Sequence, residues 1–148
     1  MTAARITGAF QVEEVPGKSR AGRQCVRLLQ PLEYRVGSAN SAEVITVPRG
    51  FETDFASIPW GIRNLFPPMG PWSRPAIVHD FLYCSRGTGV LDTANAPHLC
   101  GITRLFPYER WEADLIFREA MQVVGVPAWR RAIMYRAVRL GGWSGWGS

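Results

Sequence analysis

Apolar and polar residues alternate in short segments along the first fifty positions of the chain. The segment 32–36 alternates with a period of two, and 43–47 is rich in β-branched residues; both patterns are typical of half-buried strands. A further strand is predicted over 24–29, and a turn is predicted at Pro16 and Gly17. This part of the chain therefore predicts a small antiparallel β-sheet.

From residue 51 onward the spacing of apolar residues changes. The segment 51–59 fits neither a strand nor a helix by period, and the spacing after it is helical. Ser73 is expected to cap a helix, and Pro75 suits the first helical turn, where its missing N–H costs nothing. Three helices are predicted, over 75–85, 107–124 and 127–140.

The chain is predicted to form one α+β domain, 1–148. Two further segments are expected to connect its elements: one or two helical turns over 60–66, and a loop over 86–105. The parts of the domain are a β-rich part over 1–50, a loop-and-helix part over 51–140, and a flexible tail over 141–148 that is rich in Gly and Trp.

Apolar residues of the second and third predicted helices fall on stripes that are expected to face the core. In the second helix this stripe consists of Trp111, Leu115, Ala120 and Met121. In the third helix it consists of Ile133, Met134, Ala137, Val138 and Leu140, and four arginines lie around it. We interpret the third helix as a core face with a basic outer surface, and a role at a membrane surface or partner as the alternative.

Composition places the chain among ordinary globular proteins, because 47% of its residues are hydrophobic and 20% are charged. No run of 18 apolar residues occurs, so no membrane span is expected. The first ten residues lack the basic and apolar regions of a signal peptide. The three cysteines, Cys25, Cys84 and Cys100, are far apart and odd in number, which argues against a disulfide framework and a structural zinc site.

The net charge of +5 is carried almost entirely by arginine, since Lys18 is the only lysine. Arginine suits carboxylate and phosphate partners and protein interfaces better than lysine does. The arginines are scattered along the sequence, and no nucleic-acid-binding motif is present. We therefore expect an acidic partner surface and do not expect nucleic acid.

His79 and Asp80 lie side by side inside the apolar segment of the first predicted helix. On a helix His79 and Tyr83 are one turn apart and share a face. Asp114 lies inside the second predicted helix, where a buried carboxylate needs a partner. A hydrogen bond from His79 to Asp114 would orient the imidazole as a general base, and Tyr83 could bind the same acid. The alternatives are that His79 is a core histidine and that Asp80 and Asp114 face solvent.

Asp54 lies between two aromatic residues in a segment that is too apolar for a solvated loop. We interpret its carboxylate as a cap of backbone N–H groups or of the Ser57 side chain. Ligation of a cation by Asp54 together with Asp80 is the alternative.

Two blocks of sequence resemble the DUF1353 family of phage and prophage proteins. They are Val47-Pro-Arg-Gly-Phe-Glu-Thr-Asp-Phe-Ala-Ser-Ile-Pro59 and Ala76-Ile-Val-His-Asp-Phe-Leu-Tyr83, and the resemblance extends over 44–142. It implies a bacteriophage or prophage gene product without an established activity. Its expected partners are other phage structural proteins, and its expected location is the virion, or the host cytoplasm before assembly.

The motif His79-Asp80-x-x-Tyr83 is also similar to the catalytic helix of secreted phospholipase A2. This similarity implies a phospholipase A2-like arrangement of the three helices, with His79 as general base and Asp114 and Tyr83 as the network that holds it. It also implies that Asp80 binds a divalent cation such as calcium. The chain lacks the glycine-rich calcium loop of that family, so Asp54 would have to help replace the loop.

Two classes of function are compatible with these residues. The first is a hydrolase that acts on an ester or amide of the bacterial envelope, either lipid or peptidoglycan. The second is a non-enzymatic tail, baseplate or head protein, in which His79, Asp80 and Asp114 form a buried packing network. We interpret the chain as a virion-associated protein that carries the hydrolase-like site.

Overall fold

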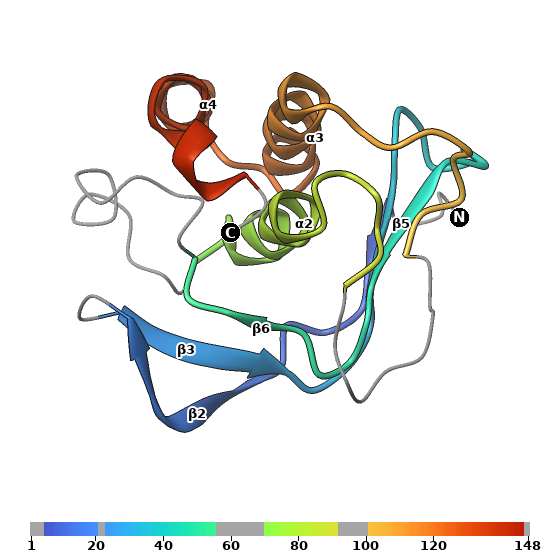
Figure 1. Ribbon diagram of the computed structural model, residues 1–148. Helices are drawn as coiled ribbons and strands as arrows, with labels where there is room; N and C mark the ends of the chain where they lie inside the picture. Colours follow the sequence, from blue (N-terminus) through green and yellow to red (C-terminus); the bar gives the residue numbers. More distant parts are fainter. Residues whose placement is uncertain (1–4, 21–22, 56–69, 92–100, 147–148) are drawn as a thin grey trace.

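The computed structural model describes residues 5–20, 23–55, 70–91 and 101–146. Within these residues two small antiparallel sheets come first and three α-helices follow, which confirms the α+β class (Figure 1). The elements are β1 (Ile6–Thr7), β2 (Val12–Arg20), β3 (Arg23–Leu28), β4 (Leu32–Arg35), β5 (Val44–Val47), β6 (Glu52–Thr53), α2 (Ser73–Cys84), α3 (Arg110–Val123), α4 (Ala128–Gly141) and the 3-10 helix η1 (Gly142–Gly145).

The strands form two three-stranded sheets, with the orders β1-β4-β5 and β2-β3-β6. Leu32 on β4 pairs with Val47 on β5, and Val26 on β3 pairs with Thr53 on β6. The sequence predicted a single sheet here. The chain changes sheet between β3 and β4, where Pro31 has no backbone N–H to offer to a strand ladder.

Strand β2 continues through Pro16 and Gly17, so the turn predicted at these residues is wrong. The ladder between β2 and β3 shifts its register between Glu14 and Ser19, as it does at a β-bulge. Gly17 has a φ of +76°, which glycine adopts at no steric cost. The two residues interrupt the ladder of a strand without reversing the chain.

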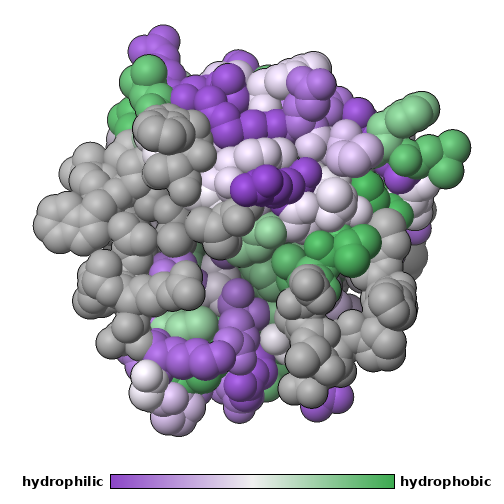
Figure 2. Space-filling view, in the orientation of Figure 1, coloured by the Kyte–Doolittle hydropathy of each residue, from purple (hydrophilic) through white to green (hydrophobic). Residues whose placement is uncertain are grey.

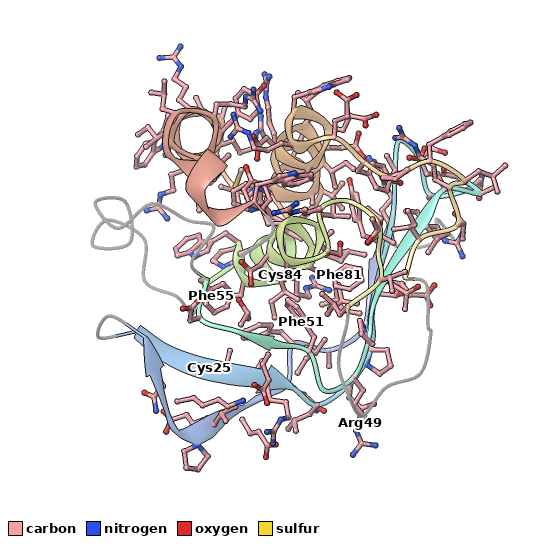
Figure 3. The ribbon with its side chains drawn as sticks, in the orientation of Figure 1. Cys25, Arg49, Phe51, Phe55, Phe81 and Cys84 are labelled. Atoms are coloured by element: carbon pink, nitrogen blue, oxygen red, sulfur yellow. The ribbon has the colours of Figure 1, made fainter. Side chains whose placement is uncertain are left out.

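Helix α2 lies in the middle of the molecule, with α3 and α4 on one side and the β2-β3-β6 sheet on the other (Figure 1). Figure 3 shows Phe51, Phe55 and Phe81 in the space between α2 and this sheet. The rings of Phe51 and Phe81 meet edge to face, with 5.7 Å between their centroids. Because α2 is covered on both sides, its sequence is an almost continuous apolar run without the one-sided stripe of a surface helix.

The starts of α2 and α3 differ in how they are capped. Trp72 precedes the first helical residue of α2, so the prediction of Ser73 as its cap is wrong; the Ser73 hydroxyl accepts the N–H of Gly70 at 2.9 Å. Helix α3 starts at a capping box, in which Glu109 and Glu112 each accept the backbone N–H of the other. This box fixes where α3 begins.

The core stripe that the sequence predicted on α3 is wrong in part. Trp111 and Leu115 are 49% and 40% exposed, whereas Asp114 and Phe117 are fully buried. The buried face of α3 combines small, aliphatic and aromatic residues with one carboxylate: Ala113, Asp114, Ile116, Phe117, Ala120 and Met121. The two residues of the predicted stripe that do face the core are Ala120 and Met121.

On α4 the buried residues are Met134 and Val138. Ile133 and Leu140 were predicted to face the core, but they are 38% and 82% exposed. Among the described elements α4 packs against α3 and η1, and it lies at the outer edge of the helical layer (Figure 1). None of the described helices is both long and apolar enough to cross a bilayer.

The chain continues from α4 directly into η1, in the segment that the sequence predicted to be a flexible tail. The ring of Trp146 meets the ring of Tyr83 edge-on, with 5.1 Å between centroids. Gly142 allows this approach, since a Cβ there would lie 2.8 Å from the Tyr83 hydroxyl. The described part of the tail therefore packs on α2.

Several sequence predictions fall outside the described residues. They are the helical turns over 60–66, Ser57, Cys100 and the middle of the loop over 86–105, residues 92–100. No disulfide joins Cys25 and Cys84, the cysteines that the structure describes.

Replacement of Gly87 by alanine should destabilise the protein more than the same change at Gly125. Both glycines have positive φ, +76° and +85°, so each alanine costs about 1–2 kcal/mol of backbone strain. A Cβ at Gly87 would also lie 1.8 Å from the carbonyl oxygen of Tyr108, whereas Gly125 has no atom within 4 Å. Urea denaturation of the two variants measures the difference. Equal losses would contradict the close packing of residue 87 on the chain before α3.

Candidate active site

His79 of α2 and Asp114 of α3 meet between the two helices. The Nε2 atom of His79 lies 2.7 Å from Oδ1 of Asp114. Neither side chain has any exposed surface. The contact between these two residues, which the sequence led us to expect, is therefore present and buried.

Tyr83, one turn after His79 on α2, contacts the same oxygen of Asp114. Its hydroxyl donates a hydrogen bond to Oδ1 of Asp114 at 2.6 Å. The imidazole of His79 lies between two rings, with centroid distances of 4.2 Å to Tyr83 and 4.6 Å to Phe117. These contacts hold the plane of the imidazole and leave it little freedom to rotate.

Two arginines that the sequence analysis did not identify bind the other oxygen of Asp114. Arg139 of α4 donates to Oδ2 at 2.7 Å, and Arg110 of α3 lies 3.6 Å from the same atom. Arg110 also donates to the carbonyl oxygens of Val138 and Arg139, which ties α3 to α4. The position of Arg110 four residues before Asp114 was a usable signal for this pair. Nothing local in the sequence pointed to Arg139.

Asp114 is held as a carboxylate by its hydrogen bonds. Burial alone would raise the pKa of its carboxyl, but the bonds to His79, Tyr83 and Arg139 outweigh burial and hold this pKa below the ordinary value. An ionised carboxylate only accepts hydrogen bonds, so Nε2 of His79 carries the proton that they share. In a neutral imidazole the lone pair is then on Nδ1.

Tyr83 remains a hydrogen-bond donor throughout the neutral range. Burial and its bond to Asp114 both raise the pKa of the phenol. The direction of donation, from Tyr83 to Asp114, is fixed as a result.

Asp80 faces the β-sheet side of α2, toward β6. Its Oδ2 accepts a hydrogen bond from the Thr53 hydroxyl, and the Cys84 sulfur lies 3.9 Å from the same oxygen. The Thr53 oxygen in turn accepts the backbone N–H of Phe55 at 2.9 Å. Phe55 has a φ of +56°, which is uncommon for a residue other than glycine. The segment that follows β6 is thus tied to α2 through Thr53.

The described residues contain no group of three or more His, Cys, Asp or Glu side chains that could hold a metal ion. Asp80 and Asp54 therefore do not belong to such a group among the residues that the structure describes. Calcium ligation by Asp80 and Asp54 stays a prediction from sequence.

A separate groove of about 260 Å³ lies on another face of α3. None of His79, Asp80 and Asp114 lines it. Its lining residues are Val36, Glu43, Arg104, Tyr108, Trp111, Glu112, Leu115, Ile116 and Glu119. The groove and the buried network are thus distinct features of the molecule.

Comparison with known proteins gives one match. Residues 26–138 fit the profile of a family described as protein of unknown function (DUF1353). Neither the curated proteins nor the solved structures gave a match. The matched segment includes His79, Tyr83 and Asp114 and ends one residue before Arg139.

Replacement of Tyr83 by phenylalanine should lower the free energy of unfolding by roughly 1–3 kcal/mol, because the buried Asp114 loses one of its donors. Tyr135→Phe is the matched control. The Tyr135 hydroxyl makes no hydrogen bond to any residue that the structure describes, and its removal should change stability by less than about 0.5 kcal/mol. Chemical denaturation measures both values, and similar losses would argue against the bond to Asp114.

The stability that Asp114 provides should disappear in acid. Its folded pKa lies below the unfolded value of about 3.9, so its contribution is complete above that value and is lost as the pH falls through the folded pKa. Asp114→Asn removes this titration. The difference in unfolding free energy between wild type and variant should therefore be constant near neutrality and shrink in acid.

Glu52 and Glu112, whose pKa values are lowered mainly by hydrogen bonds from Lys18 and Arg104, are present in both proteins and cancel in this difference. Urea titrations at a series of pH values provide the measurement. A difference that does not shrink in acid would show that Asp114 does not titrate as its surroundings require.

Proposed function

The chain belongs to the DUF1353 family, and from its own residues we propose that it is a hydrolase of ester or amide bonds in which His79 activates water. The observation that carries this proposal is the bond between His79 and Asp114, with Nε2 on the carboxylate and the ring clamped between Tyr83 and Phe117. A histidine oriented by a carboxylate is the usual arrangement of a general base.

Each residue of this network has a distinct role in the proposed reaction. Nδ1 of His79 takes a proton from water while the water oxygen bonds to the carbonyl carbon of the substrate. The tetrahedral intermediate then collapses, and the same proton passes from His79 to the leaving alcohol or amine. Asp114 keeps the imidazole in the required tautomer and stabilises the imidazolium, and Tyr83 positions Asp114.

The arginines favour the ionised form of Asp114 and occupy one of its two oxygens. Arg139 donates to Oδ2 and Arg110 lies 3.6 Å from the same atom. The Oδ1 atom is left to His79 and Tyr83. Because His79 bonds to Oδ1, the main contribution of Asp114 in the proposed reaction is to orient the imidazole ring.

The proposed setting is a bacteriophage or prophage particle, with the chain as a virion-associated tail, baseplate or head component. The resemblance of the two sequence blocks to phage proteins supports this setting. A phage must breach the envelope of its host, so the proposed substrate is an envelope ester or amide, in lipid or in peptidoglycan. Other virion proteins are the proposed partners.

A second candidate function is a non-enzymatic virion or assembly protein. It is favoured by the burial of the network, because His79 and Asp114 are fully buried and Asp80 is only 3% exposed. In that case the polar residues on both sides of α2 fix how α2 packs against α3 and β6.

His79→Gln separates the two candidates. Glutamine can still donate to Asp114 but cannot act as a base, so hydrolysis of envelope lipids or peptidoglycan fragments should fall by about 10²–10⁴-fold. The thermal unfolding midpoint should change little. Tyr135→Phe, which lies outside the network, should keep wild-type activity. Wild-type protein without activity on these substrates, or His79→Gln with full activity, would favour the packing network.

A further inference from the structure

The positive charge of the protein is concentrated near α4. Residues 120–148 contain four arginines and no aspartate or glutamate. Residues 1–119 contain thirteen basic and twelve acidic residues, so they contribute one of the five net charges. Four of the five net positive charges therefore lie in residues 120–148, although arginines occur throughout the sequence.

The outer face of α4 carries large apolar residues around one arginine. Trp129, Ile133 and Leu140 are 60%, 38% and 82% exposed, and Arg136 is exposed between them. These positions are three or four residues apart, so they form one stripe along the helix. We call this stripe the α4 ridge. Figure 2 shows hydrophobic and strongly hydrophilic residues next to each other at the upper left, where α4 lies in Figure 1.

Of the arginines on α4, Arg136 leaves positive charge at the surface. Arg136 makes no hydrogen bond or ion pair with any residue that the structure describes. The guanidinium of Arg130 lies over the rings of Trp129 and Trp72, at 5.1 and 5.8 Å from their centroids. Arg139 is the member of the group that pairs with a carboxylate, Asp114.

We propose that the α4 ridge binds an anionic lipid surface, with the axis of α4 parallel to that surface. The apolar side chains enter the boundary between headgroups and acyl chains, and Arg136 meets the phosphate groups. This binding does not depend on the proposed hydrolysis, because none of the ridge residues belongs to the His79–Asp114 network.

The chemistry of the ridge favours lipid over other anionic partners. Helix α4 lies at the periphery of the molecule (Figure 1). Exposed apolar side chains next to an exposed arginine match the two parts of an anionic bilayer surface, the acyl boundary and the phosphate groups. Nucleic acid would bind the arginines but would gain little from covering Ile133 and Leu140, because its outer surface is phosphate and sugar.

Co-sedimentation with vesicles tests the proposal. The full chain should bind vesicles of equal parts phosphatidylglycerol and phosphatidylcholine, and should bind pure phosphatidylcholine at least tenfold more weakly. Arg136→Glu should weaken binding to the anionic vesicles by roughly tenfold or more, because each basic residue near such a surface contributes substantially. Arg49→Glu is the matched control and should bind as wild type does. Arg49 is exposed and lies on the opposite side of the molecule from α4 (Figure 3).

The apolar part of the ridge needs its own pair of variants. Leu140→Ser should weaken binding several-fold, whereas Leu105→Ser, which removes a side chain that is 92% exposed outside the ridge, should not. His79→Gln should bind vesicles normally even if it abolishes hydrolysis, so the two proposals fail independently. Circular dichroism and thermal unfolding confirm that each variant is folded.

Three outcomes would overturn the proposal. The first is wild-type protein that does not bind anionic vesicles. The second is an equal loss for Arg136→Glu and Arg49→Glu, which would indicate general charge attraction. The third is binding to duplex DNA as tight as binding to vesicles and insensitive to Leu140→Ser, which would assign the ridge to nucleic acid.

Discussion

The carboxylate of Asp114 is the group on which the helical half of this protein depends. It has no exposed surface, so the free energy that water would supply has to come from protein donors. His79 and Tyr83 from α2 and Arg139 from α4 bond to this carboxylate, and Arg110 from α3 itself lies 3.6 Å from its Oδ2 atom. Removal of one donor leaves a charge only partly compensated, which is far more costly than loss of a surface ion pair. The ionised form of Asp114 is therefore stable only when the three helices are packed together.

Helix α2 has polar contacts on two opposite sides, and this explains its central place. His79 and Tyr83 face α3, while Asp80 faces β6 and accepts from Thr53. Around these residues the helix is apolar, because sheets and helices cover it on both sides. The site therefore has two halves that are adjacent in sequence but separated by the body of the helix. A reaction at His79 and a contact at Asp80 would take place on different faces of α2.

The sequence allowed the strands β4 and β5, all three helices and the His79–Asp114 contact to be predicted. Each of these depends on a local pattern or on the need of a buried acid for a partner. The outward-facing residues of α3 and α4 could not be predicted, because Trp111 and Leu140 have the spacing of core residues and only the tertiary arrangement leaves them exposed. Pro16 and Gly17 have the composition of a turn, but pairing with β3 keeps the strand extended. Arg139 was missed because its helix carries four arginines and nothing in the sequence distinguishes the one that pairs with Asp114.

The place of Arg139 in the chain has a consequence for folding during synthesis. Helices α2 and α3 leave the ribosome before α4 does, and at that stage Asp114 lacks one of its two arginines. The nascent helix pair holds a carboxylate without full charge compensation, so its native packing is disfavoured until residue 139 has emerged. The packing of α2 on α3 around Asp114 is therefore completed only after α4 has been synthesised.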